Sequence, residues 1–278
     1  MKRSLPAFAL LAIVLLGCSL FTTTAQEGTS QPGAAQNSDG TQAPTKKATL
    51  PPETNTSCNE LSFFLNQNLA TKVKCETIPE SGGADSAAFD TYPPYTKVTF
   101  VGYPLSGMLM QPVISVFPVE RFAELLPDVV DPDVSALQAL IAGGAPGDGD
   151  PPILPVQNAQ QLFLAQYAVL SFQNGSGVGY ITQYAQAYVP INNHDLFFSF
   201  QGLTSDGKYW ISVILPINHP SLWETQGDPS NSIYATIKDD PDSYYSQLTA
   251  EVNAKAPRSF VPILSLLTDL VKSMVIAP

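Results

Sequence analysis

The most regular apolar pattern in the chain lies between residues 196 and 215. Large apolar side chains occupy every second position at residues 196, 198 and 200 and again at 211, 213 and 215, and residues 204–207 between the two runs read Thr-Ser-Asp-Gly. Two such runs around a short turn that contains glycine predict a β-hairpin. Gly207 would take the left-handed backbone conformation that closes the loop.

The register of this hairpin determines which side chains are buried. The predicted register pairs Leu203 with Lys208 across the turn. It also aligns large apolar pairs on one face, namely Leu196 with Leu215, Phe198 with Val213, and Phe200 with Ile211. That face should pack into the core. Trp210 lies on the opposite face, so it is the exposed aromatic side chain that the sequence offers as a binding surface.

Further strands are predicted on the N-terminal side of the hairpin. Residues 166–172 and 178–188 are strand-like, and residues 173–177 between them contain Asn174-Gly175, a strong turn signal. Together with the hairpin they predict a four-stranded antiparallel meander. Earlier strands are expected at residues 61–65, 72–78, 96–103 and 113–117.

Capping residues and apolar spacing predict the helices. Asp131-Pro132 and Asp240-Pro241 each place an acceptor at the N-cap and proline at the first helical position, so helices should run toward Ile141 and Ala254. Residues 260–274 carry apolar side chains at helical spacing. The predicted fold class is therefore α+β: an antiparallel sheet with a four-stranded meander, helices packed against it, and a closing C-terminal amphipathic helix.

The first 18 residues have the layout of a secretory signal. Lys2 and Arg3 precede an uncharged stretch over residues 4–16, and Gly17-Cys18 follow. This ending resembles the lipobox of bacterial lipoproteins, in which the cysteine is lipidated and becomes the first mature residue. Ordinary cleavage within residues 22–26 and an uncleaved anchor helix are the alternatives, although a spanning helix needs about 20 apolar residues.

The lipobox resemblance implies a location and a domain organisation. Residues 1–17 would be the signal peptide, and acylated Cys18 would hold the protein in membrane lipid on the extracytoplasmic side of the cell membrane or outer membrane. Residues 18–57 contain few large apolar side chains, so they cannot offset the entropy of ordering and are expected to form a disordered tether. Residues 58–278 should form a single α+β domain.

The net charge of the chain limits which kinds of partner it can bind. The chain has 13 Lys+Arg against 24 Asp+Glu, and loss of residues 1–17 would bring the net charge to about −13. Nucleic acid is bound by clustered basic side chains, so we expect no nucleic-acid partner.

Cys58 and Cys75 should form a disulfide in an oxidising compartment, across a hairpin centred between Asn66 and Gln67. Two free thiols or a metal site are the alternatives.

The two histidines are the natural candidates for acid–base chemistry, but neither His194 nor His219 lies in a recognisable motif. Catalytic fingerprints of hydrolases, zinc proteases, phosphate-binding loops and dinucleotide sites are absent from the sequence. We therefore predict no catalytic residues, no cofactor and no metal. His194 and Asp195, with Trp210, form the candidate binding surface, and solvated loop residues are the alternative interpretation.

Acidic residues at 148–150 and 239–242 are the remaining candidates for a metal site. They could offer oxygen ligands to Ca²⁺, but their spacing matches no complete EF-hand loop. Helix capping explains the second cluster better.

Residues 60–275 resemble, in their order of predicted elements, the α+β domains of PsbP-like envelope proteins, and this resemblance carries no functional residues. We expect a non-enzymatic binding or assembly module at the cell envelope, with an envelope protein or a small molecule as partner. A solute- or lipid-binding lipoprotein associated with transport is the alternative, which an enclosed apolar cavity would favour. A hydrolytic envelope enzyme is the third hypothesis, which a histidine and a carboxylate within hydrogen-bond reach in a cleft would favour.

Overall fold

Two antiparallel sheets form the framework of the protein, in a computed structural model that describes residues 53–83, 85–146 and 151–277. The larger sheet has the strand order β3-β4-β5-β9-β8-β7-β6. Its strands are β3 (Lys72–Ile78), β4 (Tyr95–Val101), β5 (Val113–Pro118), β6 (Gln160–Phe172), β7 (Gly175–Ala185), β8 (Phe197–Thr204) and β9 (Tyr209–Pro216). The smaller sheet joins β1 (Thr56–Cys58), β2 (Leu61–Phe63) and β10 (Val275–Ile276). The predicted α+β class and the meander from β6 to β9 are confirmed.

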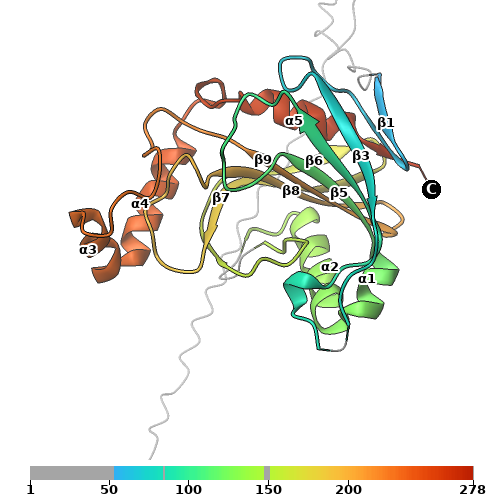
Figure 1. Cartoon of the computed structure of the whole chain (residues 1–278), viewed down its shortest axis with the longest axis horizontal. Helices are drawn as coiled ribbons and strands as arrows, with labels where there is room; N and C mark the ends of the chain where they lie inside the picture. Colours follow the sequence, from blue (N-terminus) through green and yellow to red (C-terminus); the bar gives the residue numbers. More distant parts are fainter. Residues whose placement is uncertain (1–52, 84, 147–150, 278) are drawn as a thin grey trace, which may run out of the picture. The chain divides into compact units, whose positions relative to one another are not determined.

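Helices cover both faces of the larger sheet. Helix α5 (Leu264–Ser273) lies on one face and contributes to the same apolar core as α4 (Pro241–Asn253), whereas α1 (Val119–Leu125) and α2 (Pro127–Ile141) lie on the other (Figure 1). Helix α3 (Ser232–Asp239) precedes α4, and short 3₁₀ turns occur at η1 (Ala88–Asp90) and η2 (Pro257–Ser259). None of the helices within the described ranges is long and apolar enough to cross a membrane.

The hairpin β8–β9 is confirmed, but its register differs from the predicted one. Phe200 lies opposite Val213 and Phe198 opposite Leu215, which is a shift of two residues along the partner strand. A shift of two leaves every side chain on its predicted face, because the side-chain period of a strand is two. Phe198, Phe200, Ile211 and Val213 are accordingly all buried in one core. Gly207 takes the predicted left-handed conformation, with φ of 73°.

The prediction that Trp210 is exposed is wrong. Trp210 is fully buried in a second core between the sheet and helices α1 and α2. Its indole Nε1 donates to Gln201 Oε1 at 2.8 Å, and Gln201 Nε2 donates to Ser199 and Ser212 at 3.0 Å each. These polar residues have the alternation of a solvent-facing set, yet they are buried because they satisfy one another's hydrogen bonds.

Several segment boundaries also differ from the predicted ones; β6, for example, begins at Gln160 and not at residue 166. Strand β7 begins at Gly175, so only Gln173 and Asn174 form the turn; a Cβ on Gly177 would lie 2.2 Å from the Gln201 carbonyl oxygen, a contact that only glycine avoids. Helix α2 begins at Pro127 and contains Pro132 in its interior. The C-terminal helix begins at Leu264, after η2.

The disulfide between Cys58 and Cys75 is present, with a Cα–Cα distance of 5.6 Å, but the predicted hairpin between them is not. Instead β1 pairs with β2, and β3 pairs with β4, so the disulfide joins the smaller sheet to the edge strand of the larger one. Strand β1 begins at Thr56, although the composition predicts a tether up to residue 57. The predicted signal peptide and Cys18 lie outside the described residues.

Candidate functional site

The loop before β8 places His194 and Asp195 in a cleft of about 700 Å³. Four segments that are far apart in the sequence line this cleft. Their residues are Leu109, Asn158, Ala159, Tyr184, Ala185, Gln186, Val189, His194, Asp195, Thr225, Gln226 and Gly227. The structure thus brings two of the three predicted binding residues together and separates Trp210 from them.

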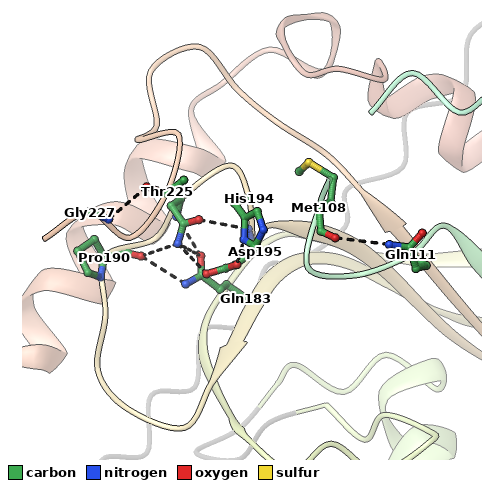
Figure 2. Close-up of polar contacts among 9 residues, drawn as sticks. Met108, Gln111, Gln183, Pro190, His194, Asp195, Thr225 and Gly227 are labelled. Atoms are coloured by element: carbon green, nitrogen blue, oxygen red, sulfur yellow. Dashed lines mark hydrogen bonds and ion pairs between the residues drawn. The ribbon is translucent and has the colours of Figure 1, made fainter. Parts of the chain in front are cut away.

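The two side chains of the predicted pair contact each other directly, and Figure 2 shows them turned toward one another. His194 Nδ1 lies 2.5 Å from Asp195 Oδ1, and the second carboxylate oxygen accepts from Asn192 Nδ2 at 3.0 Å. The His194 side chain is 42% exposed, whereas Asp195 is 14% exposed. In the neutral ring, a carboxylate at Nδ1 favours the tautomer that is protonated there, which leaves Nε2 as an acceptor with no hydrogen-bond partner among the described residues.

Two buried amide side chains hold the loop that carries His194 and Asp195. Asn192 and Gln183 are both fully buried. Gln183 Oε1 accepts from the Asn192 backbone N–H at 2.9 Å, and Asn192 Nδ2 donates to the Pro190 carbonyl at 3.0 Å. Asn192 Oδ1 in turn accepts from the Asp195 N–H at 3.2 Å. Because buried polar groups without partners are costly, this set of bonds holds the loop in one conformation.

The backbone of His194 is held by two neighbouring loops. Its N–H donates to the Glu224 carbonyl at 3.0 Å, and its own carbonyl accepts from the Leu109 N–H at 2.9 Å. Met108 and Gln111 lie on the second of these loops (Figure 2). The His194 ring is therefore positioned by a loop that is bonded on both sides, although it lies at the surface.

The side chains at the cleft carry little positive charge. Its lining includes no lysine or arginine, and Asp195 is its only carboxylate. Asp228 is the next residue in the chain after Gly227 of the lining, and the hydrogen bond from the Ser230 N–H lowers the pKa of its carboxyl group. Tyr234 donates to the Gln226 carbonyl at 3.1 Å, and burial, Asp228 and Asp195 together raise the pKa of its phenol. The surroundings of the cleft are thus acidic.

An exposed aromatic residue does accompany the cleft, but it is Trp223. Its side chain is 42% exposed, and its ring lies against Gly227, where a Cβ would approach it to 3.2 Å. The Trp223 carbonyl accepts from the Asn193 N–H at 2.7 Å, beside His194. The sequence signal was present: Trp223 lies in a polar segment with no strand pattern, where no apolar face can bury it.

His219 is separate from the cleft and has a structural environment. The Ser259 hydroxyl donates to the Ala256 carbonyl at 2.7 Å, so His219 Nε2 must be the donor in its 2.9 Å contact with that hydroxyl. Nδ1 then accepts from Ser221 at 2.8 Å. Burial, and to a smaller extent Lys255, lower the pKa of His219. These contacts describe a neutral ring that links two loops.

The acidic residues that were considered as metal ligands have other positions in the structure or lie outside the described residues. No group of three or more His, Cys, Asp and Glu side chains that could hold a metal ion occurs among them. Asp240 is an N-cap, with its side chain accepting from the Ser243 N–H at 3.1 Å, and the cluster at 148–150 lies outside the described ranges.

No protein-family model, no curated protein and no solved structure matches the chain.

Proposed function

We propose that this protein is a membrane-anchored extracytoplasmic lipoprotein, and that its domain is a non-enzymatic binding module whose ligand occupies the His194–Asp195 cleft. One observation carries the binding role: a cleft of about 700 Å³ holds an exposed imidazole on a loop that buried amides fix in place. Small-molecule sites typically measure ~300 to 1,000 Å³ and place a few polar groups precisely. The anchor rests on the lipobox resemblance of residues 15–18.

The ligand should be polar and small. The cleft combines the carboxamides of Asn158, Gln186 and Gln226 with a hydroxyl from Thr225. These groups interrupt the apolar side chains of the same lining, Leu109, Ala159, Ala185 and Val189. The cleft therefore suits a hydrogen-bonding solute better than a lipid chain, which needs a continuous apolar lining. A role in delivering a solute to a membrane transporter is compatible with this module, and a lipid ligand is disfavoured.

Native purification of the full-length protein from its own membrane tests this proposal. Mass spectrometry should detect a bound small molecule in the unmodified protein and not in Thr225→Trp, which fills the cleft from an exposed position. Ser265→Trp, on the exposed face of α5, is the matched control and should retain the molecule. Equal retention by all three proteins would place the ligand elsewhere and contradict the proposal.

Hydrolysis is the second candidate, because a histidine and a carboxylate lie within hydrogen-bond reach in the cleft. Asp195 would hold the imidazole while Nε2 takes a proton from a water molecule, which would attack the substrate as the nucleophile. Turnover of a chromogenic ester, phosphate or glycoside that is lost in both His194→Gln and Asp195→Asn would support this candidate. The absence of turnover across such a panel would leave the binding module.

A further inference from the structure

We infer that the ligand of the cleft is a neutral carbohydrate, a molecule with several adjacent hydroxyl groups on a ring. This inference rests on the proposed binding function and specifies its ligand class. It follows from the charge and the hydrogen-bonding groups of the cleft lining and from the exposed aromatic ring of Trp223, which packs on Gly227 at its edge.

The charges at the cleft disfavour ionic ligands. A lining without lysine or arginine has no permanent cation for a phosphate or carboxylate, and Asp228 lies beside it. The lining itself offers an organic cation no free carboxylate, because both oxygens of Asp195 are already bonded, one to His194 and the other to Asn192. Asp228, beside the lining, accepts from the Ser230 N–H at 2.8 Å. Moving an ion from water to such a site without a partner is costly, so a neutral ligand fits best.

The hydrogen-bonding groups of the lining match hydroxyls. A carboxamide both donates and accepts, and so does a sugar hydroxyl. Asn158 and Gln226 make no side-chain hydrogen bond to any described residue, and Gln186 uses only its Nε2, which donates to the Asn158 carbonyl at 3.1 Å. Together with the Nε2 acceptor of His194, these amides present donors and acceptors from three different loops. Neighbouring hydroxyls on one ring can bridge such groups.

The exposed indole of Trp223 supplies the apolar contact that a sugar ring needs. Trp223 packs on Gly227 of the lining and keeps 42% of its surface exposed. An aromatic ring offers a large flat apolar area with low loss of conformational entropy. The C–H face of a pyranose can pack on this indole while its hydroxyls reach the amides. The cleft, at about 700 Å³, has room for a short oligosaccharide.

Isothermal titration calorimetry on the purified full-length protein tests this inference. The neutral probes are diacetylchitobiose, maltose and cellobiose, and the charged probes are inorganic phosphate, citrate and spermidine. At least one neutral disaccharide should bind saturably, and the affinity should fall tenfold or more in both Trp223→Ala and Asn158→Ala. Phe89→Ala, which removes an aromatic ring of similar exposure (39%, against 42% for Trp223) from η1, a segment that contributes nothing to the cleft, should bind like the unmodified protein. Circular dichroism verifies that each variant is folded.

The outcomes separate the ligand class from the site. Binding of diacetylchitobiose alone would indicate an amino-sugar glycan such as a cell-wall strand, and binding of maltose or cellobiose would indicate a plain hexose oligomer. If only a charged probe binds, and Thr225→Trp abolishes that binding, the carbohydrate inference is overturned while the binding function stands. If no probe binds and native mass spectrometry finds no ligand in the cleft, both are overturned.

Discussion

At the scale of single residues, the Trp210–Gln201 hydrogen bond organises the second core. The indole is fully buried, and Gln201 Oε1 accepts both from Nε1 of Trp210 at 2.8 Å and from the Leu154 N–H at 3.2 Å. One amide thus fixes a large aromatic ring and a loop segment that lies over the sheet. Removal of the ring would leave a cavity and an underused acceptor together.

Trp210→Ala should therefore lower the free energy of unfolding by ~3 to 5 kcal/mol, a typical cost for truncation of a large buried ring. Phe200→Ala, in the other core, should cost a similar amount. Urea denaturation followed by circular dichroism measures both. An unchanged midpoint for Trp210→Ala would contradict its burial.

His219 should make stability depend on pH. Its pKa is lowered in the folded state, so below about 6.5, the ordinary pKa of histidine, the unfolded chain binds more protons than the folded one. The contribution of this ring is fully present above that pH and is lost as pH falls toward the lower, folded pKa. Asp133 acts in the opposite direction, because burial raises the pKa of its carboxyl group to about 6. Its contribution to stability is therefore lost as pH rises through that folded-state pKa.

The difference between the unmodified protein and His219→Gln isolates the histidine. Urea midpoints at pH 7.5, 6.5 and 5.5 should show a steeper loss toward acid in the unmodified protein than in the variant. Parallel profiles would mean that His219 is solvated and not buried as a neutral ring.

At the scale of elements, a helix cap and a turn residue were predicted correctly because they depend on neighbouring residues in the chain. The Asp240 cap and Pro241 begin α4 as expected, and Gly207 closes the β8–β9 hairpin. The second partner of β2 could not be predicted in the same way, because it is β10, a two-residue strand more than 200 residues further along the chain. Such pairings have high sequence separation and leave no local pattern.

The Cys58–Cys75 disulfide is the element-scale feature that is easiest to test. It closes a loop with a sequence separation of 17 and joins β1 to β3. The double variant Cys58→Ala/Cys75→Ala should lose ~3 kcal/mol of stability, as the chain-entropy model gives for a loop of this size. Mass spectrometry of non-reduced peptides should show the two cysteines joined. Alkylation of both thiols without reductant would contradict the pairing.

At the scale of the whole molecule, the sequence predicted only the part of the site whose residues are neighbours in the chain. His194 and Asp195 are neighbours in the sequence, so their pairing could be proposed from it. The segments around Leu109, Asn158 and Thr225 reach the cleft only because the folded chain brings their loops together. The Trp210 prediction failed because helices α1 and α2 cover a second face, which the hairpin pattern alone does not reveal.

Anchoring is the whole-molecule property that the N-terminal sequence predicts. Cys18→Ala should release the protein from the membrane fraction or leave it unprocessed, because acyl chains can no longer be attached there. Labelled palmitate and membrane fractionation measure this directly. Continued incorporation of the label into Cys18→Ala would contradict the lipobox interpretation.

The central claim, that the His194–Asp195 cleft is the binding site, is tested most directly by hydrogen exchange of the natively purified protein before and after removal of its bound molecule. Removal should increase exchange in the loops at residues 186–195 and 223–228 and leave the strands of the two cores unchanged. The same loops of Thr225→Trp should not respond. A response confined to another surface, with these loops unaffected, would contradict the claim.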